Sequence, residues 1–270
     1  MNRYHVLNYP GAKWSSAPLL LKNIPDHKTY CEPYAGSLAL LFSKPESPIE
    51  VVNDIDSDIV NLFSCIQKYP EELARLVLTT PYSREVYESQ YAQGPSIDSV
   101  HQAAGFLIRC WQSYGFRSNQ DMVGWKADIH GREKAYALRD WYRLPDEIIA
   151  TAERLRKVQI EHRPALRVIQ SFAFPDVFMF LDPPYLPSTC NTKQYRCTTT
   201  EQEHEELLKE IVKNPAQIMI CGNDSEMYQD YLHSWTRLPL HSPTQYGKYR
   251  TEYVWMNYNT FHQPSLFDLI

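Results

Sequence analysis

The sequence predicts an α/β fold with a parallel sheet and a ligand site at the carboxyl ends of its strands. Four short runs have the length and apolar character of buried strands, and each ends in acidic or turn-forming residues. Helical patterns separate these runs, which is the alternation typical of a parallel sheet covered by helices. Ligands of such sheets bind beyond the carboxyl ends of the strands. The expected strands are residues 28–31, 49–52, 177–181 and 217–220.

The expected helices lie between and after these strands. Apolar periodicity predicts helical segments over residues 38–42, 58–67 and 202–212. The second segment has two candidate N-cap residues, Asp56 and Ser57, whose side chains can accept hydrogen bonds from the first helical turn. With 270 residues, 43% of them hydrophobic, the chain can bury a sizeable core and form one large domain or two.

A long stretch between the second and third strands has a different character. It is rich in Arg, Trp, Tyr and Gln, and helical periodicity runs over residues 99–111 and 146–158. We therefore expect a mainly helical subdomain inserted into a discontinuous sheet domain. The expected divisions are residues 1–75 and 166–260 for the sheet domain, 76–165 for the insert and 261–270 for a C-terminal tail.

Composition argues against membrane, secreted and metal-binding classes. No window approaches eighteen apolar residues and no N-terminal stretch resembles a signal peptide, so we expect a cytoplasmic protein. The six cysteines are scattered without a CxxC pair, which favours reduced thiols. Cys190, Cys197 and His204 are evenly spaced, but no paired ligand cluster accompanies them, so we expect no metal site.

Charge is unevenly distributed along the chain. The formal net charge of −5 disfavours a nucleic-acid partner for the chain as a whole, so its distribution matters more. Residues 101–170 carry twelve Lys or Arg against eight acids, and residues 1–30 carry four against one. A polyanionic partner fits these basic stretches, although ordinary scatter of surface charge explains differences of this size equally well.

The most informative motif is Asp182-Pro183-Pro184-Tyr185, directly after the third expected strand. The prolines fix φ and remove two amide donors, so the carbonyls of Asp182 and Pro183 can face a ligand. Carboxylate and carbonyls all accept hydrogen bonds, and the tyrosine ring offers a stacking face. A planar ring that bears an amino group fits this combination. A proline-stiffened turn at a strand end is the alternative.

A second group of residues favours a nucleoside ligand. Ala35, Gly36 and Ser37 follow the first expected strand and allow the backbone to approach a ligand closely. Asp54 follows the second strand about twenty residues after Glu32, a spacing that suits a carboxylate binding a ribose diol. GxGxxG and P-loop patterns are missing from the sequence, which favours a nucleoside without a pyrophosphate. A simple turn acid is the alternative for Asp54.

The N-terminal segment contributes a further candidate. Tyr9-Pro10-Gly11-Ala12-Lys13-Trp14 is a turn with aromatic residues on both sides and one cation. Lys13 can meet a ligand carboxylate, although most lysines are solvated surface charges.

Together these motifs resemble the Dam-like DNA adenine-N6 methyltransferases of the D12 class, alpha group. The segments 9–13 and 32–37, Asp54 and the Asp182 tetrapeptide occur in that family's order, and residues 250–257 resemble its late strand. The similarity covers about residues 7–65 and 175–258. It implies a Rossmann-like sheet that binds S-adenosyl-L-methionine and an insert that recognises the target sequence in duplex DNA.

The resemblance also implies a role for each matching residue. Tyr9 and Lys13 would hold the methionine portion of the cofactor, the loop around Tyr34 and Gly36 would pass beneath it, and Asp54 would bind the ribose. Two residues depart from the family pattern, because Leu38 stands where a second glycine is usual and Tyr34 where phenylalanine is usual. The expected cofactor contacts are Tyr9, Gly11, Ala12, Lys13, Glu32, Tyr34, Gly36, Ser37, Asp54, Ile55 (against the adenine) and Asp182.

The expected catalytic residues are Asp182, Pro183, Pro184 and Tyr185. An exocyclic amine is a poor nucleophile, and hydrogen bonds to the Asp182 carboxylate and the Pro183 carbonyl favour a more nucleophilic nitrogen. The target base must first flip out of the duplex, and Tyr185 can stack on it. Cytosine-N4 methylation stays open as an alternative from the residues alone, as does a non-catalytic DNA-binding protein with a decayed cofactor fold.

Sequence specificity is expected in the insert. Polar side chains there can read base edges or phosphates, and aromatic ones can wedge or stack, although a polar loop in a helical subdomain is the alternative. The expected DNA contacts are Tyr114, Arg117, Asn119, Gln120, Trp125 and Lys126, together with Ser188 after the catalytic tetrapeptide. We expect a monomer; a restriction enzyme as companion is neither required nor excluded.

The tail carries a possible docking peptide. Gln263-Pro264-Ser265-Leu266-Phe267 resembles the short peptide by which bacterial DNA enzymes bind the replication sliding clamp, with Pro264 in place of the common leucine. A glutamine and two adjacent apolar anchors suit insertion into a partner's groove. An apolar tail packed on its own domain is the alternative.

Overall fold

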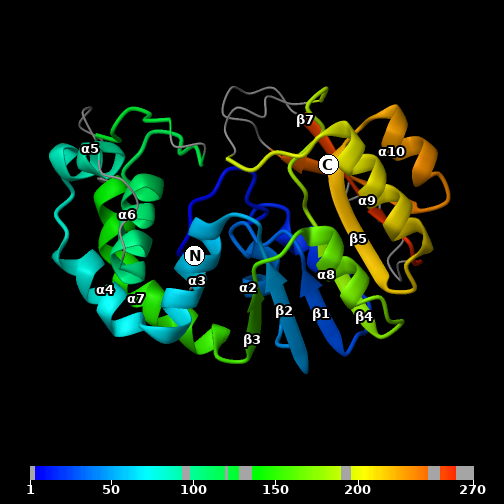
Figure 1. The fold of residues 1–270 in the computed structure, drawn as a ribbon, viewed down its shortest axis with the longest axis horizontal. Helices are drawn as coiled ribbons and strands as arrows, with labels where there is room; N and C mark the ends of the chain where they lie inside the picture. The colour runs from blue at the N-terminus through cyan, green and yellow to red at the C-terminus, as the bar shows by residue number, and fades with distance from the viewer. Residues whose placement is uncertain are drawn as a thin grey trace.

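A seven-stranded sheet forms the centre of the computed structural model, which describes residues 4–92, 98–118, 121–127, 136–189, 196–242 and 250–259 (Figure 1). The strand order is β3-β2-β1-β4-β5-β7-β6. Neighbours from β3 to β5 pair in parallel, whereas β7 is antiparallel to both β5 and β6. The strands are β1 Thr29–Glu32, β2 Ile49–Asn53, β3 Val158–Glu161, β4 Val177–Leu181, β5 Gln217–Asn223, β6 Thr236–Ser242 and β7 Arg250–Met256.

Ten helices connect the strands within the described residues. They are α1 Ala17–Leu21, α2 Ala39–Ser43, α3 Ser57–Lys68, α4 Pro70–Thr79, α5 Arg84–Ala92, α6 Ser99–Trp111, α7 Tyr136–Leu155, α8 Ala165–Ser171, α9 Glu201–Lys213 and α10 Glu226–Tyr231. The cap of α3 is Asp56, whose side chain accepts from the amide of Asp58. A reciprocal capping box between Thr200 and Glu203 begins α9.

The sheet separates two hydrophobic layers. Strand β4 is buried on both sides, and alternate residues of it enter different layers, Phe178 and Phe180 one and Met179 and Leu181 the other. The first layer contains buried residues of α2 and α3 and continues into the core of helices α4–α7. The second contains buried residues of α8, α9 and α10, which cover the opposite face (Figure 1). This is the layered α/β architecture that the sequence predicts.

Three expectations need correction. The helix expected over residues 146–158 begins earlier, at Tyr136, and ends at Leu155. It runs through Pro145, because the burial of Trp141, Leu144 and Ile148 outweighs the hydrogen bond that a proline cannot donate. Residues 158–161 form β3 instead, paired in parallel with β2. This part of the expected insert therefore belongs to the sheet, while the other domain limits stay a prediction.

The second and third corrections concern the last two strands. Strand β6 has no counterpart in the sequence prediction, and its Pro239 argues locally against a strand. A proline is tolerated here because β6 lies at the edge of the sheet, where one side needs no ladder donor. Strand β7 makes the sheet mixed rather than wholly parallel.

A buried ion network anchors the end of α7 to the sheet. The ammonium of Lys44 lies 2.6 Å from Oε1 of Glu50 on β2, and the guanidinium of Arg154 donates to the same oxygen at 2.8 Å. Arg154 also donates to the carbonyl of Leu41. These two cations lower the pKa of Glu50 although burial opposes its charge. The network fixes where the chain returns from the helical subdomain to the sheet.

Several further features hold for the described part of the chain. Cys31, Cys65, Cys110, Cys197 and Cys221 form no disulfide, and Cys190 lies outside the described residues. No helix in this part is long and apolar enough to cross a membrane. It also contains no cluster of three or more His, Cys, Asp or Glu side chains suited to a metal ion.

Candidate active site

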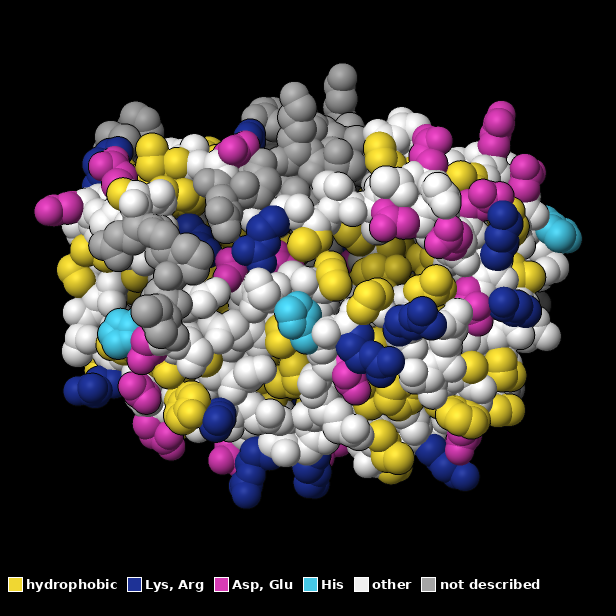
Figure 2. Space-filling model, viewed as in Figure 1, with side chains coloured by type: hydrophobic (Ala, Val, Ile, Leu, Met, Phe, Trp, Pro, Cys, Tyr) yellow, Lys and Arg dark blue, Asp and Glu magenta, His cyan; other side chains and the backbone are white. Residues whose placement is uncertain are grey.

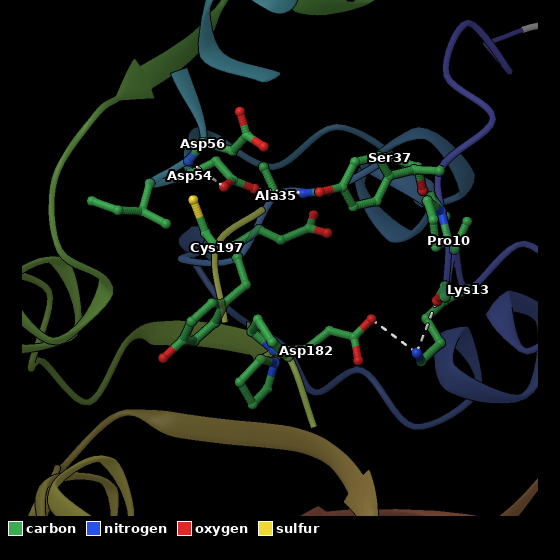
Figure 3. A pocket seen from close by; sticks show the side chains of 18 of the residues that line it. Pro10, Lys13, Ala35, Ser37, Asp54, Asp56, Asp182 and Cys197 are labelled. Atoms are coloured by element: carbon green, nitrogen blue, oxygen red, sulfur yellow. Dashed lines mark hydrogen bonds and ion pairs between the residues drawn. The ribbon is translucent and has the colours of Figure 1, made fainter. Parts of the chain in front are cut away.

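A pocket opens at the carboxyl ends of β1, β2 and β4 (Figure 3). Glu32 ends β1, Asp54 follows β2 and Asp182 follows β4. The strand order reverses between β1 and β4, and this is the point at which open α/β sheets bind their ligands. The pocket holds about 910 Å³ of space, part of it open to solvent. The pocket is lined by all residues expected to bind the cofactor. All four residues of the expected catalytic tetrapeptide line it as well.

Further residues line the pocket beside the expected cofactor and catalytic contacts. The additional lining residues are Pro10, Ala35, Ala39, Leu40, Asp56, Phe180, Cys197, Thr198 and Thr199. Most of them are neighbours of expected residues and follow from the same loops. Residues 197–199 are different, because they lie beyond the tetrapeptide in sequence and carry no motif. Only the packing of their loop brings them to the pocket.

The loop after β1 turns sharply beneath the pocket. Gly36 has φ +47°, and Leu38 adopts the same left-handed conformation with φ 55°. Leu38 stands at one of the two departures from the family pattern, yet its backbone keeps the conformation that suits a glycine. The cost is about 1–2 kcal/mol for a residue with a side chain. Complete burial of the leucine, typically about 1.5–3 kcal/mol, offsets it.

Asp54 joins this loop to the start of α3. One carboxylate oxygen accepts from the amide of Gly36 and the other from the amide of Asp56, both at 2.9 Å. Burial raises the pKa of Asp54 to about 6, although the backbone hydrogen bonds favour the charged form. Each oxygen keeps acceptor capacity for a ligand in the pocket, since a carboxylate accepts about four hydrogen bonds.

Glu32 is the second acid of the pocket and differs from Asp54 in charge. It is almost completely buried and accepts from the Tyr30 hydroxyl at 2.7 Å. Burial raises its pKa to about 8, and the neighbouring Asp182 carboxylate adds to the effect. Glu32 is therefore mainly neutral at pH 7 and can donate as well as accept a hydrogen bond.

Lys13 is buried beside the expected catalytic tetrapeptide, so the surface alternative for it is wrong. Its ammonium lies 2.9 Å from Oδ2 of Asp182, donates to the carbonyl of Gly11 at 3.0 Å, and sits 5.2 Å from the centre of the Tyr185 ring (Figure 3). Burial opposes its charge, but Asp182, Tyr185 and Glu252 together raise the pKa of Lys13 well above its ordinary value. The pocket thus contains a buried lysine that is ion-paired with Asp182.

The backbone of the tetrapeptide is held from the side of α9. The carbonyl of Pro184 accepts from the Thr199 hydroxyl at 2.8 Å and lies 2.9 Å from Nε2 of His204. Nδ1 of His204 is 3.1 Å from the Tyr228 hydroxyl, a pattern that fits a neutral ring with its proton on Nε2. Burial lowers the pKa of His204 accordingly. His204 therefore supports the tetrapeptide.

Comparison with known families identifies the family of this chain. A family model described as D12 class N6 adenine-specific DNA methyltransferase matches residues 9–241, which include every wall of the pocket. The chain belongs to this family. It is an enzyme that methylates the N6 amino group of adenine in DNA. A search of curated proteins found no match.

This assignment decides between the alternatives that the residues alone leave open. The family is adenine-specific, which sets aside cytosine-N4 methylation, and it consists of enzymes, which sets aside a non-catalytic DNA-binding protein. The Rossmann-like fold expected from the motifs is confirmed by the family and by the seven-stranded sheet.

In the methyltransferase, the described DNA contacts expected in the insert lie on residues 113–118 and 121–126, which we call the arm. Ser113 and Trp125 form an antiparallel bridge, and the amide of Tyr114 donates to the carbonyl of Gly124 at 2.7 Å. Tyr114 is 77% exposed and Arg117 is also exposed, whereas Trp125 packs against Tyr82 with ring centres 5.4 Å apart. Lys126 is half-buried, Ser188 is exposed, and Asn119 and Gln120 lie outside the described residues.

The arm of the methyltransferase is linked to the pocket by hydrogen bonds. The Ser118 hydroxyl accepts from the Tyr9 hydroxyl at 3.2 Å and from the amide of Arg196 at 2.9 Å. The Arg196 guanidinium forms ion pairs with Asp56 and Asp58 at the start of α3. Arg109 of α6 also donates to Asp58, at 3.1 Å. The helical subdomain is thereby tied to the residues that line the pocket.

Charges on the surface of the methyltransferase are mixed. On the face seen in Figure 2, Lys and Arg side chains are interspersed with Asp and Glu side chains rather than gathered in one patch of described residues. This face therefore shows no single basic patch of described residues.

Proposed function

We propose that this enzyme binds S-adenosyl-L-methionine in the pocket and methylates an adenine that is flipped out of duplex DNA against Asp182-Pro183-Pro184-Tyr185. The main supporting observation is that Asp54, Lys13 and Asp182 all line one pocket. This pocket lies where the order of the strands reverses. These residues are far apart in sequence, and no single local motif requires them to meet.

The lining of the pocket fits this cofactor. Asp54 offers acceptor oxygens for the two ribose hydroxyls, and Ile55 and Leu40 offer apolar surface for the adenine ring. Lys13, with Tyr9 close by, suits the methionine carboxylate. S-adenosyl-L-methionine supplies a methyl group on a positively charged sulfur. The carboxylates of Asp54 and Asp182 in the pocket suit a ligand of that charge.

The tetrapeptide supplies the acceptors for the amine. Asp182 is 20% exposed at its side chain and points to the pocket, while Thr199 and His204 hold the carbonyl of Pro184. The Pro183 carbonyl and the Asp182 carboxylate then accept from the two N–H groups of the target amine, which makes its nitrogen more nucleophilic. Tyr185 offers a stacking surface that repays about 1–3 kcal/mol of the cost of flipping.

The first prediction concerns Asp182. Asp182→Ala is expected to lower the methylation rate by about 10²-fold or more, because the amine loses its charged acceptor. The measurement is transfer of labelled methyl groups to unmethylated genomic DNA, with folding checked by circular dichroism. Asp176→Ala is the matched control, since Asp176 is a half-exposed surface acid beside Lys28. Near-normal activity of Asp182→Ala would contradict the proposal, and a wild-type enzyme inactive on every DNA would remove it.

The second prediction concerns pH. The Asp54 carboxyl takes up a proton as pH falls through about 6 and then loses acceptor capacity, so cofactor affinity is expected to fall about tenfold per pH unit below that value. Calorimetric titration of S-adenosyl-L-methionine between pH 5 and 7 measures the effect. Asp54→Asn should bind weakly and show a flat profile. A pH-independent dissociation constant in the wild-type enzyme would contradict the role of Asp54.

The effect of Asp54 on the stability of the fold does not imitate this profile. A carboxyl whose pKa is raised in the folded state binds its proton more tightly there than in the unfolded chain. Its contribution to stability is therefore present at low pH and is lost as pH rises from about 4 towards 6. The effect on stability runs opposite to the effect on cofactor binding. Glu32 titrates near pH 8 and lies outside the measured range.

We also propose that the arm around Tyr114 and Arg117 contacts DNA. Both side chains are exposed, and Ser118 links the same segment to Tyr9 and Arg196 at the pocket. An exposed aromatic ring can wedge between bases, and an arginine can read guanine or bind phosphate. Asn119 and Gln120 remain proposals on sequence grounds only.

The third prediction tests the arm. If the Arg117 side chain reads a base, Arg117→Ala is expected to weaken DNA binding by about 1–3 kcal/mol. If it binds a phosphate instead, the variant is expected to show a shallower dependence of DNA affinity on salt concentration, by the slope of one phosphate contact. Binding is measured by fluorescence anisotropy at several salt concentrations, with cofactor affinity unchanged. The control is Arg156→Ala. The Arg156 side chain is 72% exposed and lies far from the arm in the sequence. Equal DNA binding by Arg117→Ala and wild type would reject the assignment.

The tail peptide Gln263–Phe267 stays a proposal, because it lies outside the described residues. We expect a chain that ends at His262 to lose binding to purified sliding clamp while it methylates free DNA normally. Surface plasmon resonance with immobilised clamp measures this. Equal behaviour of the two chains would reject the docking peptide. That the enzyme is a cytoplasmic monomer likewise stays a proposal.

A further inference from the structure

Glu252 lies at the active edge of the sheet although its strand runs in the opposite direction to β4 and β5. It is near the start of β7, and its register partner is Asn223, the last residue of β5. An antiparallel strand presents its first residues where parallel neighbours present their last ones. Glu252 therefore reaches the same edge as Asp182. No motif of the sequence assigns it a role.

Glu252 shares two neighbours with Asp182. The Lys13 ammonium is 2.9 Å from Oδ2 of Asp182 and 3.8 Å from Oε2 of Glu252. The Tyr185 hydroxyl is 3.5 Å from Oδ1 of Asp182 and also forms a hydrogen bond with Glu252. One lysine and one tyrosine thus stand between two carboxylates. The cluster is compact and contains the two ends of the catalytic tetrapeptide.

The two carboxylates of this cluster differ in how well they are hydrogen-bonded. The Glu252 side chain is only 16% exposed, and within the described structure its Oε2 accepts no hydrogen bond. A buried carboxylate oxygen without a donor is unfavourable. Burial accordingly raises the pKa of Glu252, against the opposing effects of Lys13 and Tyr185. Lys13 needs to move only slightly to donate to this oxygen instead of to Asp182.

Asp182 has conflicting demands in this arrangement. Its proposed role is to accept from the target amine, but in the described state one of its oxygens is occupied by Lys13 at 2.9 Å. The ion pair orients the Asp182 carboxylate towards Lys13, so turning this carboxylate to the target amine would break the pair. At this depth, Lys13 needs acidic partners when it leaves Asp182. Glu252 provides one on the protein, beside the cofactor carboxylate that is proposed to meet the same lysine.

We propose that Glu252 is a positioning residue for methyl transfer, which takes over Lys13 and Tyr185 when Asp182 turns its carboxylate to the target amine. The inference rests on the role proposed above for Asp182. It makes Glu252 act through Asp182 and Lys13, not by touching the base. A purely structural glutamate would instead affect stability and leave the rate of the folded enzyme unchanged.

The test compares Glu252→Gln, Glu252→Asp and wild type in single-turnover methylation of unmethylated genomic DNA. The amide keeps the shape of the side chain but removes its charge, so Lys13 stays with Asp182. We expect a rate roughly 10- to 100-fold lower, the range for one lost hydrogen bond to a charged group. Glu252→Asp should restore part of the rate. Dissociation constants for S-adenosyl-L-methionine and DNA should stay within about threefold, because neither ligand is held by Glu252 itself.

Controls separate the possible outcomes. Glu226→Gln, at an exposed position in the first turn of α10, should behave like wild type. A wild-type single-turnover rate for a folded Glu252→Gln enzyme would overturn the proposal, as would a loss that is explained entirely by weaker ligand binding. If Glu252→Gln does not fold, Glu252→Asp tests the proposal in its place. Its single-turnover rate is expected to be at least threefold lower than that of wild type. An unchanged rate would overturn the proposal.

Asp182→Ala is measured in the same series. If that variant keeps its activity, the proposed function of the tetrapeptide fails. If it is inactive while Glu252→Gln is fully active, only the role of Glu252 fails.

Discussion

The buried ion pair between Lys13 and Asp182 is the interaction on which the rest of the site depends. It joins the N-terminal segment to the end of β4 at 2.9 Å, with both side chains largely removed from water. An isolated charge would be very costly at this depth, so each partner offsets the cost of burying the other. The pair therefore closes the pocket on the side away from Asp54 and fixes the acid that is proposed to face the target amine.

Around this pair, burial sets the charge of the other groups. Glu32 has its pKa raised to about 8 and is mainly neutral at pH 7, and His204 is neutral because burial lowers its pKa. Neutral Glu32 and His204 provide directed hydrogen bonds, while Lys13 and Asp182 provide charge. The adenine methyltransferase thus combines one strong ion pair with neutral supports, and Glu252 is the acid left without sufficient donors.

The sequence predicted the interior of the sheet well. The expected runs at 28–31, 49–52, 177–181 and 217–220 correspond to β1, β2, β4 and β5, because central strands of a parallel sheet are apolar on both faces and need no partner information to be recognised. The edge strands β3 and β6 were not predicted. The local sequence of β3 continues a helical pattern, and β6 contains Pro239, which argues against a strand. Both strands form because they pair with β2 and β7, which the local sequence does not reveal.

The same distinction holds for the site. The sequence by itself determined the acids at the strand ends, the glycine turn and the proline-stiffened tetrapeptide, because each is a local pattern with a local physical cause. Only the tertiary structure decided that Lys13 is buried, that residues 197–199 form a wall of the pocket, and that Glu252 faces Lys13 across from Asp182. These contacts join segments that are distant along the chain, and strand order and burial create them rather than any spacing of residues.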